Sequence, residues 1–399
     1  MHLNFNYFKK SALFFQVLLV ASCELVVNVD IPEEPRKPVV NSLMNPDSTW
    51  SVNVSWSKSV LDEKPTTFIE NAIVKIKNQK GEVIEVLVYD KHGYYRSANG
   101  RPEGGQEYSV EVDIPEYKTV IGRTRIPTKP EITNGTIKAS FFNSKLSGKY
   151  SVSFKDNAAE QNYYDLSVYS IHDFGLNQST EEPLRTVGFT FVQSDDPAIA
   201  ADILPLEQSI LFSDKLFNAD EIILHLKTPD NHAGHVTLGN VGGFFVIKSV
   251  SKEYYDYATT LKLQYKVSKD PLAQPVAVSS NIENGLGVIA SYNTSVYYVL
   301  YPAPIMTSFT PSQGRPGDII RIEGENLSQY PLSSTTVYFL TNEDGHYTKP
   351  YDGIVPAQIL ESSPTTISVA VPAGAKTNSI LLESFGHRVL SSQKFVVIE

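Results

Sequence analysis

Apolar residues recur at every second position through much of this 399-residue chain, and this period limits the folds open to it. In STWSVNVSWSKSV, residues 48–60, tryptophan and valine alternate with polar residues, and QEYSVEVDIP, residues 106–115, repeats the pattern. Successive side chains of a strand point to opposite faces of a sheet, so each segment predicts a strand with one buried face. We therefore expect a mainly β protein.

Proline-flanked breaks divide the chain into three predicted domains. One break is IPTKPEI, residues 126–132, and another falls near Pro302. We predict an N-terminal Ig-like or transthyretin-like sandwich over 23–127, a β-rich middle domain with one or two helices over 128–302, and an Ig-like domain over 303–399. The fold class is thus mainly β, with tandem Ig-like β-sandwich domains flanking the middle domain.

Two local signals are specific enough to place single side chains. Tyr108 follows a glycine turn and opens a late strand of the first sandwich, where a tyrosine hydroxyl commonly bonds back to the backbone. In SVSKEYYDYATTLKLQYKV, residues 249–267, Tyr254, Tyr257 and Leu261 fall at helical spacing. Ser251 stands where a helix N-cap belongs, so this segment is the best helix candidate.

The single cysteine, Cys23, follows a short basic segment, an apolar run and small residues. That order predicts a secretory signal over residues 1–22, because the apolar run is shorter than a membrane span. Val20-Ala21-Ser22 before Cys23 resembles the bacterial lipobox, in which the cysteine thiol is acylated and the signal is cut before it. The alternative is a buried cysteine in an ordinary signal peptide. We predict lipidation at Cys23, and no disulfide forms within the mature chain.

The charge of the chain argues against nucleic acid as a partner. The precursor carries a net charge of −10, and removing residues 1–22 removes Lys9 and Lys10 and no acid, which leaves 32 basic against 44 acidic residues, or −12. An acidic chain repels phosphate backbones. We predict attachment to the outer membrane through the Cys23 lipid, on the outward face, where palmitate would be part of the anchor.

The last segment resembles the IPT/TIG domain, an Ig-like fold. The residues that carry the resemblance are Ile305, Pro311, Gly314, Gly317, Ile322, Gly324, Val371-Pro372, Gly374 and Phe395-Val396. In that family these positions are structural: the glycines allow turns and the apolar residues fill the core. The resemblance implies no ligand site.

The preceding part, from Cys23 to Tyr301, resembles a family of Bacteroidota lipoproteins known only as domain of unknown function four-two-four-nine. The segments that carry it are VVNSLMNPDSTWSVNVSWS (39–57), ENAIVKI (70–76), EYSVEVDIPEY (107–117), NYYDLSVYS (162–170), LFSDKLFNADE (211–221), EYYDYATTL (253–261) and SNIENGLGVIASY (280–292). The last is the most distinctive, although the family commonly has an aromatic residue where Ile289 stands. The resemblance implies partnership with TonB-dependent outer-membrane receptors.

Histidines and polar residues give two candidate sites. His225, His232 and His235 have spacings that suit a zinc or copper site, but loop histidines explain them without a metal. We predict neither a metal nor a cofactor. Beside two glycines, the polar group Asn281, Glu283 and Asn284 either lines a ligand site or supplies turn geometry, and glycine spacing favours the turn.

Aromatic residues allow two interpretations as well. Trp50 and Trp56 would suit stacking on sugar rings, but both lie on the alternating face of Val52 and Val54, which favours the core.

No enzyme signature is present: the sequence has no Gly-x-Ser-x-Gly, phosphate loop or His-Glu-x-x-His motif. We predict a non-catalytic surface lipoprotein that assists a TonB-dependent receptor in nutrient uptake and binds a glycan or a peptide. The first alternative is a free-standing adhesin or structural lipoprotein. The second is a glycan-degrading enzyme whose carboxylate pair only its spacing in three dimensions would reveal.

Overall fold

A computed structural model describes most of the chain after residue 34. The described residues are 35–59, 62, 64–142, 145–176, 183–194, 204–205, 208–215, 220–228, 240–268, 272–328, 335–341, 353–384 and 387–398. The chain divides into two compact units, of which the larger comprises 37–57 and 66–399. In the smaller unit, Arg36 Nη2 lies 3.0 Å from Asp62 Oδ2. The strands, the helix and the cleft described below belong to the larger unit.

The N-terminal sandwich is built from short, mostly antiparallel strands. They are β1 (Pro38–Met44), β2 (Ser51–Trp56), β3 (Ile73–Asn78), β4 (Val83–Tyr89), β5 (Tyr94–Arg96), β6 (Glu107–Asp113) and β7 (Val120–Arg125). Their spatial order is β1-β2-β5-β4-β3-β6-β7, so the chain folds back between β2 and β3. Alternate residues of β1, β2 and β6 turn inward, as the period of two predicts.

The core of this sandwich contains the side chains expected from the sequence. Trp50 is buried, Trp56 is partly buried against the same core, and Val52 lies between them on the inward face. The ring of Tyr108 meets Trp50 edge-on at 4.8 Å between centroids. The Glu103 backbone N–H donates to the Tyr108 hydroxyl at 3.1 Å, which confirms the predicted bond back to the main chain.

A hairpin from much later in the chain closes this sandwich at both ends. Its strands are β17 (Ile282–Glu283) and β18 (Leu286–Leu300). β17 pairs with β7, whereas β18 pairs in parallel with β1 along residues 39–44. Ile289 of β18 is completely buried in the N-terminal core. The distinctive segment 280–292 is therefore this hairpin.

Gly287 shows how closely β18 approaches β1. Its φ is +113°, and a Cβ there would collide with the Val40 carbonyl oxygen. Any side chain would therefore push the two strands apart. This agrees with the structural interpretation of the glycines in segment 280–292.

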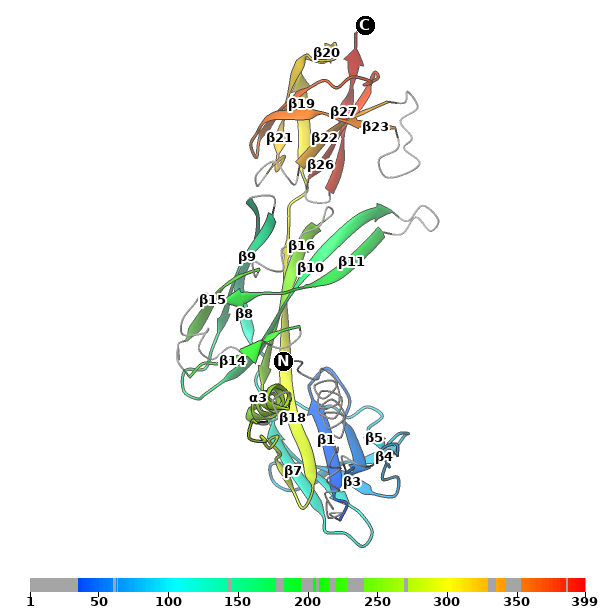
Figure 1. The fold of residues 1–399 in the computed structure, drawn as a ribbon, viewed down its shortest axis with the longest axis vertical. Helices are drawn as coiled ribbons and strands as arrows, with labels where there is room; N and C mark the ends of the chain where they lie inside the picture. Colours follow the sequence, from blue (N-terminus) through cyan, green and yellow to red (C-terminus); the bar gives the residue numbers. More distant parts are fainter. Residues whose placement is uncertain are drawn as a thin grey trace, which may run out of the picture. The chain divides into compact units, whose positions relative to one another are not determined.

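The same strand continues into the middle domain. Residues 292–300 of β18 pair antiparallel with residues 250–242 of β16 (Asn240–Val250), as Figure 1 shows. β16 pairs in turn with β10 (Tyr163–Leu176). On its other side β10 pairs with β14 (Ile210–Ser213) and with β11 (Pro183–Thr190). The short strand β13 (Leu204–Pro205) pairs with β14. One 14-stranded sheet thus runs through both domains.

A second sheet completes the middle domain. Its spatial order is β12 (Gln193–Ser194), β15 (Glu221–Lys227), β9 (Lys145–Lys155) and β8 (Glu131–Phe142). The core between the two sheets contains Phe154, Leu224, Phe245 and Phe212, all fully buried.

The C-terminal sandwich has its own core. One of its sheets holds β19 (Ile305–Thr310), β21 (Ile319–Glu325), β25 (Thr366–Ala370) and β24 (Gln358–Ser362). The other holds β20 (Gln313–Gly314), β27 (His387–Val397), β26 (Asn378–Ser384), β22 (Thr335–Leu340) and β23 (Ile354–Pro356). Ile322, Val369 and Phe395 are fully buried between them.

One helix, α3 (Lys252–Val267), occurs in the described part of the chain. It begins where the sequence predicts: Ser251 is its N-cap, and the Ser251 hydroxyl accepts from the Tyr254 N–H at 3.3 Å. Among the described residues, no helix is both long and apolar enough to cross a membrane. A mainly β fold with one helix confirms the predicted fold class. The predicted domain boundaries stay a prediction.

Candidate functional site: a cleft beneath helix α3

A cleft of about 1040 Å³ lies between α3 and the outer face of the large sheet. We call it the α3 cleft. Its floor comes from four neighbouring strands and its roof from one face of α3. The floor residues are Asn41, Ser42 and Leu43 of β1, Ser51 and Asn53 of β2, Tyr94 of β5, and Val288 and Ala290 of β18; the roof residues are Tyr254, Tyr257, Ala258, Leu261, Lys262 and Tyr265.

The roof is an apolar stripe that stays uncovered. Its residues recur at helical spacing, and such a stripe normally packs on the core. Here no residue of α3 is buried. Leu261 and Tyr265 are 42% and 66% exposed, and the floor residues Leu43 and Tyr94 are 51% and 40% exposed. Two apolar surfaces thus face each other across open space, and a ligand between them would remove both from water.

The first turn of α3 is fixed to the sheet, which holds the roof in place. The Ser251 N–H donates to the Ser291 carbonyl oxygen at 2.9 Å, and the Ser291 N–H donates to the Ser251 hydroxyl at 3.2 Å. The Thr124 hydroxyl on β7 donates to Glu253 Oε2 at 3.1 Å. These bonds connect the start of the helix to both β18 and β7.

Tyr254 connects α3 to a buried carboxylate of the middle domain. Its hydroxyl donates to Asp165 Oδ2 on β10 at 2.9 Å, and burial together with this carboxylate raises the pKa of Tyr254. Asp165 is only 2% exposed, and its Oδ1 has no hydrogen-bond partner among the described residues. Lys248 Nζ lies 3.9 Å from Oδ2. The Tyr254 hydroxyl is therefore the main hydrogen-bond donor that this buried carboxylate has.

The floor offers side chains rather than a strand edge. β1, β2 and β5 are interior strands of the large sheet, and on the side of β18 away from β1 the backbone of Ile289 is bonded by the Asn281 amide and that of Ser291 by Ser251. An extended peptide cannot add itself as a further strand here. Recognition in the α3 cleft depends on side-chain contacts.

Of the described residues that line the α3 cleft, Lys262 alone is charged. Burial lowers the pKa of Lys262, because desolvation disfavours its ammonium form. No carboxylate in the described ranges forms an ion pair with it. The cleft therefore presents one positive charge that the described chain does not neutralise.

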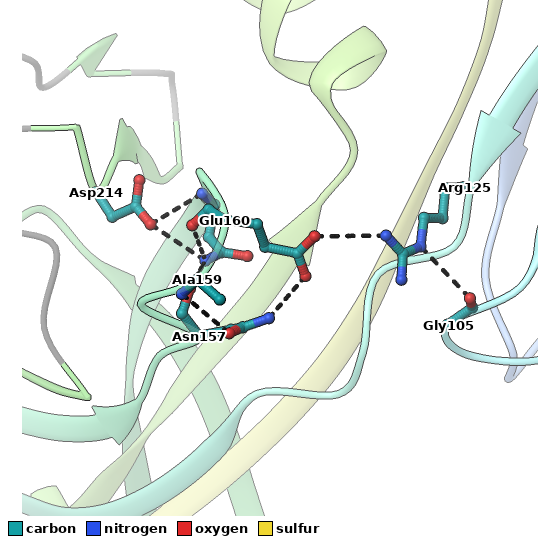
Figure 2. Close-up of polar contacts among 7 residues, drawn as sticks. Gly105, Arg125, Asn157, Ala159, Glu160 and Asp214 are labelled. Atoms are coloured by element: carbon teal, nitrogen blue, oxygen red, sulfur yellow. Dashed lines mark hydrogen bonds and ion pairs between the residues drawn. The ribbon is translucent and has the colours of Figure 1, made fainter.

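A second polar region lies around β7 and the loop 156–162, and Figure 2 shows it. Arg125 Nη1 on β7 lies 3.4 Å from Glu160 Oε2, and the Asn157 amide donates to Glu160 Oε1 at 2.8 Å. Arg125 Nε donates to the Gly105 carbonyl oxygen at 3.4 Å. These contacts connect the loop to the N-terminal sandwich.

Asp214 supports the other side of this loop. Both the backbone N–H and the side-chain amide of Asn162 donate to Asp214 Oδ2, at 2.9 and 3.1 Å. Asp214 is buried, and burial raises its pKa. Nearby, the Tyr164 hydroxyl donates to Asp156 Oδ1, while Asp156 Oδ2 has no partner among the described residues. A polar cavity of about 370 Å³ adjoins these groups.

The candidate metal ligands are not brought together in the described structure. His225 is exposed on β15, and its carbonyl oxygen accepts from the Ser194 hydroxyl at 3.1 Å. His232 and His235 lie outside the described residues, and so does Cys23, the predicted lipidation site. In the ranges that the structure covers, no group of three metal-ligating side chains is found.

The three polar candidates in segment 280–292 hold the β17–β18 hairpin against β7. Asn281 donates to the Arg123 and Ile289 carbonyl oxygens at 2.7 and 2.8 Å. Glu283 forms an ion pair with Arg123 at 2.5 Å. Asn284, at φ +60°, donates to the Thr119 carbonyl oxygen at 3.0 Å. These bonds favour the structural interpretation over a ligand site.

Sequence reasoning found the helix but missed the cleft. The spacing of Tyr254, Tyr257 and Leu261 indicated an apolar face, and the ordinary expectation for such a face is burial. Lys262 was not singled out. The available signal was a lysine within the apolar stripe itself, one residue after Leu261.

Comparison with known proteins gives a family and no function. A family model described as "Domain of unknown function (DUF4249)" matches residues 25–297. This confirms the resemblance over that part, whereas the IPT/TIG resemblance of the C-terminal sandwich is not confirmed. No curated protein matches the chain.

Similarity to solved structures is low throughout. A protein of unknown function from Bacteroides thetaiotaomicron VPI-5482 is 17% identical over 24% of this chain and 22% of its own, with a TM-score of 0.21. A crystal structure with xylogluco-oligosaccharide is 12% identical over 90% and 60%, with a TM-score of 0.25. The major pilin SpaD from Corynebacterium diphtheriae is 9% identical over 89% and 88%, with a TM-score of 0.19. The chain spans less than two thirds of the first two structures.

Proposed function

This chain belongs to the DUF4249 family of domains of unknown function, and we propose that it is a non-catalytic binding protein that takes its ligand in the α3 cleft. We further propose that Cys23 anchors it by lipid in the outer membrane, facing outward. There it would assist a TonB-dependent receptor by holding the ligand near the entrance of the receptor. Tethering raises the effective concentration of ligand without any bond being broken.

The observation that carries the proposal is the pair of exposed apolar faces in the α3 cleft. Its volume of about 1040 Å³ lies at the upper end of the roughly 300–1,000 Å³ range of small-molecule sites. Such sites are mostly apolar and aromatic with a few polar groups, and three of the six roof residues are tyrosines. The first turn of α3 is fixed to the sheet, so the cleft exists before a ligand arrives.

A neutral apolar dye tests whether the α3 cleft binds ligands. N-phenyl-1-naphthylamine fluoresces when it leaves water, and we expect saturable binding to the mature protein. Ala258→Trp places an indole in the roof and should abolish this binding. Gln264→Trp adds the same side chain to an exposed position outside the cleft and should leave binding unchanged. Equal binding by both variants would contradict the proposed site.

The anchor is tested separately. Cys23→Ala should prevent incorporation of labelled palmitate and release the protein from membranes, because the thiol is the acylated group. Ser22→Ala keeps a small residue before the thiol and serves as the control. Palmitate uptake and membrane retention by Cys23→Ala would refute the lipid anchor.

The receptor partnership is tested by recovery of the tagged protein in mild detergent, with mass spectrometry of the material that accompanies it. A stoichiometric outer-membrane barrel supports the uptake role. Recovery of the lipoprotein alone, where known receptor complexes survive, supports a free-standing surface binder or adhesin instead.

One observation favours a second candidate, a glycan hydrolase. A buried acid with a raised pKa suits general-acid catalysis, and Asp214 lies near Asp156, which lines a polar cavity. Hydrolysis of a surface polysaccharide by the purified protein, abolished in Asp214→Asn while the thermal unfolding transition is retained, would establish it. No hydrolysis across a panel of polysaccharides leaves the binding role.

A further inference from the structure

We propose that the α3 cleft binds a monoanionic amphiphile, an apolar molecule with a single carboxylate that pairs with the Lys262 ammonium. This inference rests on the proposed function, because it names the ligand class of the same cleft. Three features of the described lining lead to it: one charge that no described carboxylate neutralises, no second cation, and polar side chains most of which already have partners.

The charge of Lys262 calls for an anionic partner. The nearest acid on the same stretch of helix, Asp256, is already paired with Lys252 at the i, i+4 spacing. Glu253 accepts from the Thr124 hydroxyl and faces β7. The desolvation that lowers the pKa of Lys262 would be offset by a carboxylate bound beside it, since an ion pair favours the charged form. A ligand anion therefore supplies what the described chain lacks.

The head group carries one negative charge because the lining carries one positive charge. The described lining of the α3 cleft contains no arginine and no second lysine. Phosphate groups commonly gather arginine forks or several backbone N–H donors, as at helix N-termini. The N–H groups at the N-terminus of α3 are capped by Ser251, which lies ten residues before Leu261. A carboxylate matches a single lysine better than a phosphate does.

The rest of the ligand is apolar because most polar side chains of the floor already have partners. Asn41 Oδ1 accepts from the Val288 N–H at 3.1 Å, and the Asn53 amide donates to the His92 carbonyl oxygen at 3.0 Å. The Ser42 hydroxyl donates to the Ser51 carbonyl oxygen at 2.7 Å. A sugar, whose many hydroxyls need partners once they leave water, finds few here.

The roof has the same character. The Tyr254 hydroxyl is engaged by Asp165, and Ala258 and Leu261 offer only carbon. An alkyl chain or an aromatic ring body would cover these surfaces and gain the hydrophobic free energy that they now forgo. Of the glycan and peptide ligands predicted from the sequence, neither fits this lining as well as an amphiphile.

The test uses dodecanoate and its uncharged analogue dodecanol, both kept monomeric, as competitors of bound N-phenyl-1-naphthylamine on the mature protein. We expect dodecanoate to displace the dye at a concentration about tenfold lower than dodecanol, the effect of one charge-assisted contact at a partly exposed site. Lys262→Met should remove this preference and Lys262→Arg should retain it. Lys266→Met removes a lysine of the same helix that does not line the cleft, and should change nothing.

Two results overturn the inference, and they differ in what else they affect. Equal displacement by dodecanoate and dodecanol, with no change in Lys262→Met, would mean that the ligand is neutral, while the α3 cleft remains the binding site. If neither competitor displaces the dye, or if Ala258→Trp still binds it, the proposed function fails together with the inference. Unchanged circular dichroism of each variant shows that its fold is intact.

Discussion

The hydrogen bond between Tyr254 and Asp165 gives the sharpest test of how α3 is held. Tyr254→Phe removes one hydroxyl and little else. Asp165 is 2% exposed and its Oδ1 already lacks a partner, so the variant leaves the carboxylate with Lys248 Nζ, at 3.9 Å, as the one ion-pair partner that the described residues give it. A hydrogen bond to a charged group contributes about 1.5–3 kcal/mol. We expect a loss of about 2 kcal/mol in the free energy of unfolding.

Differential scanning calorimetry measures this loss. For a cooperative unit of this size, 2 kcal/mol corresponds to a decrease in Tm of roughly 4–8 °C. Tyr257→Phe is the matched control, since Tyr257 lies one turn further along α3 and its side-chain hydroxyl makes no hydrogen bond with the described residues. We expect that variant to remain within about 0.5 kcal/mol of the unmodified protein.

A double-mutant cycle identifies the partner. When Asp165→Asn has removed the charge, Tyr254→Phe should cost less than about 1 kcal/mol, the value of a neutral hydrogen bond. If Tyr254→Phe is as stable as Tyr257→Phe, or costs the same with and without the Asp165 charge, the assignment of this bond as the anchor of α3 is wrong.

Three further predictions concern stability. Gly287→Ala should lower the free energy of unfolding by at least about 1–3 kcal/mol, from backbone strain at φ +113° and collision with the Val40 carbonyl oxygen, as measured by calorimetry. Phe154→Ala empties a fully buried position of the middle core and should cost about 3–5 kcal/mol in urea unfolding. The pKa of Asp113 is held below its ordinary value first by the hydrogen bond from Lys75. The ionised Asp113 carboxylate therefore stabilises the fold above its unfolded pKa near 3.9, and this contribution is lost as pH falls through its folded pKa. The Tm difference between Asp113→Asn and the unmodified protein should vanish in acid.

Each of these predictions has an outcome that contradicts it. Gly81→Ala has a similar positive φ but open space around the added Cβ, so an equal loss there would leave the collision at Gly287 without effect. A cost below 1 kcal/mol for Phe154→Ala would mean that the middle core closes around the cavity. A Tm difference for Asp113→Asn that persists from pH 7 to pH 2 would exclude the ionised carboxylate as its source.

Local patterns predicted the elements of this fold, because their signals lie within a few residues. The period of two placed the strand that follows Trp50, and the hydroxyl at Ser251 placed the start of α3. The pairing of β1 with β18 joins residues separated by 247 positions, as in the bond between Val288 and Asn41. Parallel pairing at such a separation has no turn or linker to announce it. The sequence of segment 280–292 was distinctive, but only the structure explains why.

The α3 cleft could not be predicted for a different reason. An apolar stripe on a helix has the same sequence whether it packs on a sheet or faces a space above it. What separates the two cases is the position of the first turn of α3. It depends on hydrogen bonds with Ser291, Thr124 and Asp165, which are distant in sequence from α3 or from one another. Lys262 gains significance only after the rest of the lining is known.

The sharing of β18 between the two domains sets an order of events during synthesis. β1 is among the first strands to leave the ribosome, but its parallel neighbour is completed only near residue 291. Chains usually fold domain by domain as they emerge, and long sequence separation between partners slows folding. We expect the N-terminal sandwich to wait, with its β1 edge open, until the whole middle domain has been made. The C-terminal sandwich, whose strands all lie within 305–397, can fold as soon as it emerges.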